Sequence, residues 1–272
     1  MSERLRARFA QAKAEGRAAF MPYIMAAYPR RDLTVPLLLA LEAGGGDLIE
    51  LGVPFTDPLA DGATIQRANE VAVAEGVTFA DCLEMVREAR AQGLEAPVLL
   101  MGYDNPILAY GEERAAADAA AAGVDGFIVV DLPPEEATTF RDACTRHGVS
   151  FVPLVAPTTS EARMAAVAAV ADSFIYCVSV TGTTGQRSEL PAELGEFVAA
   201  IRRHTELPLA VGFGVSTREQ VELVGRLAEG VVMGSAIIAA IDAAGAEDCA
   251  QRVREFVEHV TGHSRDGGAG PG

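Results

Sequence analysis

The stretch FADCLEMVREARAQGLEAPVLLMGY, residues 79–103, joins a helical pattern to a buried strand. Residues 79–93 follow the pattern of an amphipathic helix and end in glycine, a common helix stop. Residues 97–103 then form an apolar run of strand length, ending in a glycine and a tyrosine. A helix that feeds into an apolar strand is the repeating unit of α/β proteins.

The same unit recurs along the whole chain. Eight apolar runs of strand length are expected over residues 20–28, 47–53, 97–103, 126–132, 150–156, 173–180, 207–214 and 230–237. Between them, residues 113–123 form a helical segment that ends in glycine, and residues 160–171 form another with Ser160 as N-cap. Eight such units in 272 residues favour a (β/α)8 TIM barrel over the alternative, an open doubly wound sheet.

The chain is expected to form one domain. No linker or change of composition interrupts the repeats, so we expect a single barrel over residues 1–262 and a flexible tail over residues 263–272. Residues 2–16, SERLRARFAQAKAEG, have the pattern of an amphipathic helix. We expect this extra helix to cap the bottom of the barrel.

Composition limits the partners and the compartment. The formal net charge of −16 argues against nucleic acid and anionic membranes as partners. No apolar stretch reaches the roughly 18 uncharged residues of a membrane span, and the first residues lack an apolar signal-peptide core. We therefore expect a cytoplasmic protein, with its four separated cysteines reduced and packed in the interior. They are Cys82, Cys144, Cys177 and Cys249.

Lysine is almost absent. Lys13 is the only one among 22 basic residues, and it lies in the predicted N-terminal helix. This bias toward arginine can arise from genome composition alone, but its consequence for the chemistry of the site is the same. A Schiff-base mechanism requires a lysine in the active site, and none lies at a predicted strand end.

Two glycine sites lie where barrels bind phosphate, at the carboxyl ends of the last two strands. Gly212 and Gly214 follow the seventh run, and Gly234 and Ser235 close the eighth at the start of a helical segment. Backbone N–H groups at glycines and at a helix N-terminus bind anions, although single glycines after strands are often turn residues. We predict a phosphorylated substrate.

The segment ELGVPFTDPLADG, residues 50–62, carries three carboxylates. Glu50 lies within an apolar run, where burial would raise its pKa and suit it to acid–base catalysis; the alternative is a structural glutamate at the barrel mouth. Asp61 precedes a glycine, so a turn residue and a catalytic residue both fit. Asp57 fits an exposed loop or a contact point.

Two other features leave alternatives open. Asp131 follows the fourth run, where it fits either a ligand-binding residue or the cap of a loop before the next helix. Residues 181–190, TGTTGQRSEL, fit either a mobile lid over the site or an ordinary long connection.

Other chemistries lack their residues. The four histidines lie away from the predicted strand ends, so a histidine-based metal site is not expected. They are His147, His204, His259 and His263. The chain contains no GxSxG, P-loop or GxGxxG segment. Acid–base chemistry on a phosphorylated substrate remains.

A long motif around Glu50 points to a family. IELGVPFTDPLADGATIQRA, residues 49–68, closely resembles the signature of the tryptophan synthase alpha subunit family. Shorter matches follow in order: VLLMGYDNPI, GFIVVDLPPEE, FVPLVAPTTS, YCVSVTGTTG, AVGFGVST and GSAII. The resemblance covers residues 15–260. It implies a (β/α)8 barrel that cleaves indole-3-glycerol phosphate to indole and glyceraldehyde 3-phosphate, a retro-aldol lyase of tryptophan biosynthesis.

The resemblance also implies roles for individual residues. Glu50 matches the acid–base residue that protonates C3 of the indole, and Asp61 matches the carboxylate that stabilises the positive charge developing on the indole nitrogen. Protonated at C3, the indole is its own electron sink, so neither a lysine imine nor a metal is required. The residues that match substrate-binding positions are Tyr23, Tyr176, Thr184, Gly185, Gly214, Gly234 and Ser235.

A protein partner is implied as well. Members of the family work in an alpha2beta2 complex with a beta subunit that holds pyridoxal phosphate and receives indole through a tunnel. The resemblance therefore places the cofactor on the partner and none on this chain. The loop after the second strand, including Asp57, and the segment after the sixth strand would belong to the communicating surface.

The chain departs from the family pattern at three positions. The family commonly shows T-x-G-x-P after the first strand, where this chain has Met25 and Ala27, and YYNP after the third, where it has Asp104. These positions border the mouth of the predicted site and leave Glu50 and Asp61 unchanged. We interpret them as variation within the family.

Three other functions were weighed against the alpha-subunit prediction. A free-standing indole-releasing lyase would differ only in being independent of a partner. A catalytically silent binding subunit would not need the intact pair of Glu50 and Asp61. An isomerase with similar phosphate glycines would not be expected to carry the PFTDPLADG loop.

Overall fold

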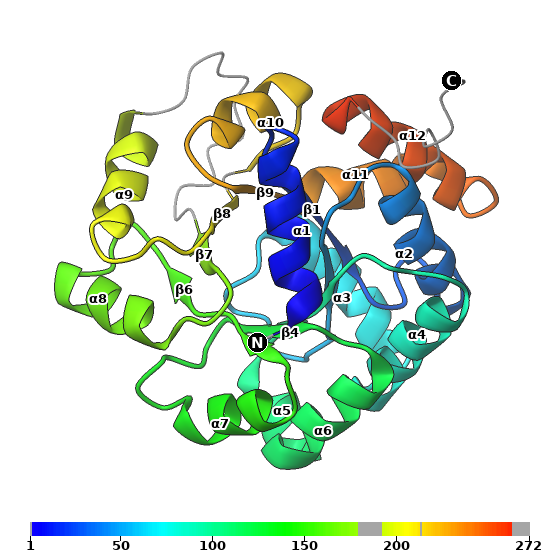
Figure 1. Cartoon of the computed structure of the whole chain (residues 1–272). Coiled ribbons are helices and arrows are strands. Elements are labelled where there is room, and N and C mark those ends of the chain that lie inside the picture. The colour runs from blue at the N-terminus through cyan, green and yellow to red at the C-terminus, as the bar shows by residue number, and fades with distance from the viewer. Residues whose placement is uncertain (1, 179–191, 213, 263–272) are drawn as a thin grey trace.

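Short parallel strands form a barrel surrounded by helices (Figure 1). The computed structural model describes residues 2–178, 192–212 and 214–262, and in these ranges nine strands pair in the order β5-β4-β3-β2-β1-β9-β8-β7-β6. They are β1 (Ala19–Met25), β2 (Ile49–Gly52), β3 (Val98–Gly102), β4 (Gly126–Val129), β5 (Ser150–Phe151), β6 (Leu154–Val155), β7 (Ile175–Val178), β8 (Leu209–Gly212) and β9 (Gly230–Met233).

The fifth predicted strand, residues 150–156, is divided in two. Its first half, β5, pairs with β4, and its second half, β6, pairs with β7. Backbone pairing continues through the bend, because Val152 N donates to Phe127 O at 2.9 Å and Tyr176 N donates to Pro153 O at 3.0 Å. This segment therefore joins the two ends of the strand order, and the nine strands fill eight positions of a barrel. The predicted (β/α)8 architecture is confirmed.

Helices surround the barrel on its outside, except for the first, which lies across one end (Figure 1). They are α1 (Glu3–Ala14), α2 (Thr34–Ala43) with the 3-10 turn η1 (Arg31–Leu33) before it, α3 (Ala63–Ala74), α4 (Phe79–Ala91), α5 (Asp104–Tyr110), α6 (Glu112–Ala122), α7 (Thr138–Arg146), α8 (Glu161–Val170), α9 (Ala192–Arg202), α10 (Arg218–Gly225), α11 (Ser235–Ala244) and α12 (Cys249–Thr261). In the described part of the chain, every helix is too short or too polar to span a bilayer.

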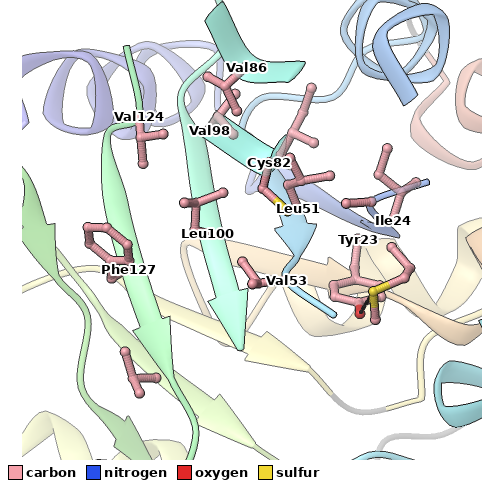
Figure 2. Close-up of a cluster of buried hydrophobic side chains, with 14 of the residues drawn as sticks. Tyr23, Ile24, Leu51, Val53, Cys82, Val86, Val98, Leu100, Val124 and Phe127 are labelled. Carbon is pink, nitrogen blue, oxygen red and sulfur yellow. Dashed lines mark hydrogen bonds between the residues drawn. The ribbon is translucent and has the colours of Figure 1, made fainter. Parts of the chain in front are cut away.

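One set of strand side chains points outward and packs under the helices, because successive residues of a strand face opposite sides. Figure 2 shows Leu51, Leu100 and Phe127 from neighbouring strands close to Cys82 and Val86 of α4. These five side chains are at most 1% exposed. The main hydrophobic core therefore lies between the barrel wall and its helices. All four cysteines are buried as free thiols, as predicted.

The alternate set points into the barrel and meets α1. Leu5, Phe9 and Ala12 of α1 are buried in one cluster with inward side chains from around the barrel. These are Ala19, Met21, Leu48, Leu99, Ile128, Val152, Phe174, Tyr176, Ala210 and Val232. Helix α1 thus lies against the interior near the ends where the strands begin.

Two buried aspartates lie at this same lower end. Asp125 is 3% exposed and accepts hydrogen bonds from Arg90 Nη2 at 2.8 Å, from Val98 N at 3.0 Å and from Ser2 Oγ at 2.6 Å. Asp47 is fully buried. Its carboxylate forms an ion pair with Arg17 and accepts a hydrogen bond from Phe20 N at 2.8 Å. Each of these charges is therefore compensated by an arginine and by backbone N–H groups.

Candidate active site

Glu50 points into the barrel from β2. It lies two residues after the inward-facing Leu48, and it is opposite Tyr23 of β1 and Leu99 of β3 in the strand register. The side chain is fully buried. The Tyr176 hydroxyl donates to its Oε2 at 3.3 Å, while Oε1 has no hydrogen-bond partner among the described residues.

This environment favours the neutral form of Glu50. Burial raises the pKa of its carboxyl to about 8, and the hydrogen bond from Tyr176 only partly opposes that rise. The carboxyl is therefore largely protonated at neutral pH and can donate a proton inside the barrel. A glutamate with a purely structural role would be expected to have more than one partner.

Asp61 lies on the loop after β2, beside Tyr103, which follows β3. The Tyr103 hydroxyl accepts a hydrogen bond from Ala60 N, the residue before Asp61, at 2.9 Å. Burial raises the pKa of Asp61 to about 6, against the lowering effect of Tyr103. Asp61 is therefore mostly ionised at neutral pH, whereas Glu50 is mostly neutral. Nothing in the sequence pattern identified Tyr103 as a neighbour of Asp61.

Tyr23 lies near both acids. Its side chain is 4% exposed, and its pKa is raised well above the usual value by burial and then by the nearby charges of Asp61 and Glu50. Its hydroxyl lies so close to Gly52 that a Cβ at that position would be 2.3 Å from the oxygen. Residue 52 must therefore be glycine for Tyr23 to occupy this place. Gly52 was not predicted from the sequence, although a glycine at a strand end was a usable signal.

The glycines predicted to bind phosphate follow two neighbouring strands. Gly212 of β8 and Val232 of β9 are register partners, and Gly214 and Gly234 each follow two residues later. Gly214 has a φ of +61°, a left-handed conformation that favours glycine. Gly234 is the N-cap of α11, and Ser235 is its first residue. The first N–H groups of a helix lack partners within the helix, so they are available to bind an anion.

This glycine pair borders the acid pair. A Cβ at Gly234 would lie 3.6 Å from Ile65 Cδ1 and 3.8 Å from Tyr23 Cβ. A molecule bound at the start of α11 would therefore touch the same tyrosine that lies near Glu50 and Asp61. The structure thus brings together Glu50, Asp61, Tyr23, Tyr176, Gly234 and Ser235 at the carboxyl ends of the strands, with Gly214 beside them.

Two other aspartates of the sequence analysis lie outside this group. Asp57 is exposed on the loop after β2 and accepts a hydrogen bond from Thr56 Oγ1 at 2.7 Å. Asp131 accepts a hydrogen bond from Asp104 N at 2.8 Å, at the first residue of α5. Asp131 therefore caps the start of α5, a helix that precedes it in the sequence, which is neither of the two predicted roles.

The departures from the family pattern have clear structural settings. Ala27 has a φ of +59°, the one left-handed non-glycine residue in the described ranges, which explains why the family places glycine there. Met25 is 2% exposed, and its Sδ is 4.0 Å from the Tyr23 hydroxyl. It therefore packs against the wall of the site.

Other residues of the sequence predictions lie outside the described ranges or at the other end of the barrel. Thr184, Gly185 and the segment 181–190 lie outside the described residues, as do His263 and the tail. Lys13 is exposed on α1 at the lower end of the barrel. Within the described ranges, no group of three or more histidine, cysteine or acidic side chains is placed to hold a metal ion.

Known proteins resemble this chain in sequence and in fold. A family model described as "Tryptophan synthase alpha chain" matches residues 9–265. The tryptophan synthase alpha chain of Roseiflexus castenholzii is 50% identical over 254 residues, which are 93% of this chain and 97% of that protein. Tryptophan synthase subunit alpha from Legionella pneumophila has a similar crystal structure, with a TM-score of 0.88, 38% identity, and coverage of 96% of this chain and 97% of that chain. A chain of the tryptophan synthase complex from Pyrococcus furiosus has a TM-score of 0.82 at 36% identity, covering 90% of this chain and 98% of that chain. The chain belongs to the tryptophan synthase alpha chain family.

Proposed function

We propose that this chain cleaves indole-3-glycerol phosphate to indole and glyceraldehyde 3-phosphate with Glu50 as the acid–base residue and Asp61 as its electrostatic partner. The observation that carries this assignment is the difference between the two carboxyls. Burial raises the pKa of Glu50 to about 8 and that of Asp61 to about 6, so one is a proton donor and the other an anion at neutral pH.

The reaction needs these two states at the same time. Glu50 donates its proton to C3 of the indole, and the positive charge that forms on the ring nitrogen is stabilised by the Asp61 carboxylate. The bond between C3 and the glycerol carbon then breaks, and its electron pair returns to the ring. The hydroxyl on that carbon loses its proton as it becomes the aldehyde, and ionised Glu50 can accept this proton. The enzyme is thereby restored.

The substrate would be held at both ends. Gly214, Gly234 and Ser235 would bind the phosphate through backbone N–H groups and one hydroxyl. Tyr23 and Tyr176 would pack beside the indole. Thr184 and Gly185 remain assigned from the resemblance alone, as residues that cover the bound substrate.

The beta subunit is the partner of this family, and we propose that it docks over the loop after β2. Asp57 is exposed on this loop, and Leu59 is 92% exposed. Leu108 of α5, the helix that follows Tyr103, is 52% exposed. An exposed leucine pair beside an active site is suited to burial against another protein. Pyridoxal phosphate would belong to the partner, since the only lysine of this chain is exposed on α1. This role would place the chain in the cytoplasm.

The decisive experiment is the release of indole from indole-3-glycerol phosphate by the purified chain, with and without a beta subunit. We expect weak release by the chain alone and a strong rise when the partner is added. Strong release that ignores the partner would favour a free-standing lyase. Absence of release in both conditions would contradict the lyase and favour a binding subunit.

A further inference from the structure

A second contact between the segments that form the site lies away from the substrate. The Tyr28 hydroxyl donates to the Asp242 carboxylate, and Arg67 forms an ion pair with the other oxygen of the same carboxylate. Tyr28 follows β1, Arg67 lies on α3 and Asp242 on α11. One carboxylate therefore connects three segments that are far apart in the sequence.

These are the same three segments that meet at the phosphate end of the site. There, the N-cap Gly234 of α11 lies against Ile65 of α3 and Tyr23 of β1. Helices α3 and α11 contact each other and β1 (Figure 1). The three segments thus approach one another at two points, beside Gly234 and at the polar group of Tyr28, Arg67 and Asp242.

Within the polar group, the bond between Tyr28 and Asp242 is the more buried contact. Tyr28 is 6% exposed, and the side chain of Asp242 is 33% exposed. Arg67, at 55%, is the exposed member and contributes less, because water screens its charge. A hydrogen bond from a buried tyrosine to a carboxylate is a charge-assisted contact and orients both partners.

We propose that Asp242 is a positioning residue. It holds the start of α11 in place against β1 and α3 and so strengthens binding of the substrate's phosphate. This role rests on the proposed function of the site. Asp242 touches neither the acids nor the glycines and acts through the backbone of α11. Its loss should weaken phosphate binding and leave the proton transfers unchanged.

The chain contains a matched control. The Tyr110 hydroxyl donates to Asp118 Oδ2 at 2.6 Å, and Arg114 Nε lies 3.3 Å from the same atom. This is the same combination of tyrosine, arginine and aspartate, with a similar exposure of 41% for Asp118. It joins only the neighbouring helices α5 and α6. Asp118→Asn therefore removes an equivalent charge without touching the segments of the phosphate site.

The test compares Asp242→Asn with Asp118→Asn in the full chain. We measure the dissociation constant for glycerol 3-phosphate by calorimetry, and KM and kcat for indole-3-glycerol phosphate. Asp242→Asn is expected to raise the dissociation constant and KM about three- to tenfold, with kcat within about twofold. Asp118→Asn should change neither value, and Asp242→Glu should restore binding. Equal effects of the two asparagine variants, or a loss confined to thermal stability, would overturn the proposal.

The same measurements separate this role from the proposed reaction. If the unmodified chain binds glycerol 3-phosphate but releases no indole, the reaction is wrong, and the dissociation constants still decide the role of Asp242. If the unmodified chain does not bind glycerol 3-phosphate, the role of Asp242 is wrong as well.

Discussion

Buried carboxyls at the two ends of the barrel differ in how many partners compensate them. At the lower end, Asp125 is held by Arg90, by Ser2 and by a backbone N–H group, and Asp47 by Arg17 and another N–H group. At the upper end, Glu50 is equally buried, but among the described residues its carboxyl has one partner, the Tyr176 hydroxyl, and Oε1 has none.

The difference separates stability from function. A buried charge with full compensation holds its neighbours together, and removing one partner leaves an uncompensated charge. A buried carboxyl with little compensation stays protonated and keeps its proton available for transfer. The barrel therefore places compensated acids where its strands begin and the sparsely compensated Glu50 where they end, which is the end where active sites lie in this fold.

Replacing Glu50 at the upper end should abolish activity and leave the fold intact. Glu50→Gln is expected to lower indole release about 10³-fold or more, because the proton donor is lost. Gln has the shape of the protonated acid, so the melting temperature should not fall. Steady-state kinetics and thermal unfolding check both expectations. Retained activity in the variant would remove Glu50 from its assigned role.

Removing Asp125 at the lower end should do the reverse. Asp125→Ala leaves Arg90, whose side chain is 13% exposed, without its charge partner, and should lower the free energy of unfolding by about 3–5 kcal/mol. Urea denaturation measures this loss. The matched control is Asp32→Ala: Asp32 pairs with Arg30 at 66% exposure, where water screens the charges, so its loss should change the free energy of unfolding little. Equal losses of unfolding free energy in the two variants would show that the buried ion pair at the lower end stabilises the fold no more than an exposed one.

The pH dependence of stability should also distinguish the two ends. The pKa of Glu50 is about 8 in the folded chain and 4.5 by its ordinary value, so the folded state binds more protons between these pH values. Stability from the neutral carboxyl is present below pH 4.5 and is lost as pH rises to about 8. Relative to Glu50→Gln, the unmodified chain should lose a few kcal/mol across this range. Parallel curves would mean that Glu50 is ionised in the folded chain.

A smaller effect is expected from replacing an exposed leucine at the upper end of the barrel. Leu59→Ser should weaken binding of the beta subunit about tenfold, because an exposed apolar side chain would lose its buried contact. Calorimetric titration with the partner measures the change. Ala14→Ser, at an exposed position of α1, should have no effect. Unchanged binding by Leu59→Ser would place the interface elsewhere.

The smallest expected effect concerns the turn after β1. Ala27 holds a φ of +59°, which costs energy for any residue with a Cβ. Ala27→Gly relieves this strain but adds freedom to the unfolded chain, so we expect a net gain of about 0.5–1 kcal/mol. Chemical denaturation of the two proteins tests the sign. A loss of stability would show that the strain at residue 27 is negligible.

The barrel could be predicted because its signals are local. Each apolar run and each helix pattern lies within about ten to fifteen residues, and eight repeats determine the architecture. The break in the fifth strand was not predicted, although Pro153 lies within the run and has no N–H group for the ladder. The lower-end acids were also missed, since their partners come from distant segments.

The site was predictable only in part for the same reason. A glutamate in an apolar strand is conspicuous by itself, so Glu50 followed from the residues alone. The prediction of a role for Asp61 depended on the family resemblance. Tyr103, whose hydroxyl bonds the preceding residue Ala60, lies 43 residues from Ala60 in the sequence, so no local pattern joins them. The need for glycine at residue 52 follows only from the position of Tyr23 on the adjacent strand. Contacts across the barrel, which no short pattern records, complete the site.

The solitary lysine gives this barrel a chemical handle. Lys13 is exposed on α1, at the opposite end of the barrel from Glu50 and Asp61. Apart from the α-amino group of the chain, an amine-reactive dye or linker has this single target. A chain tethered to a surface through Lys13 would therefore present its active site and the exposed leucines outward, in one defined orientation.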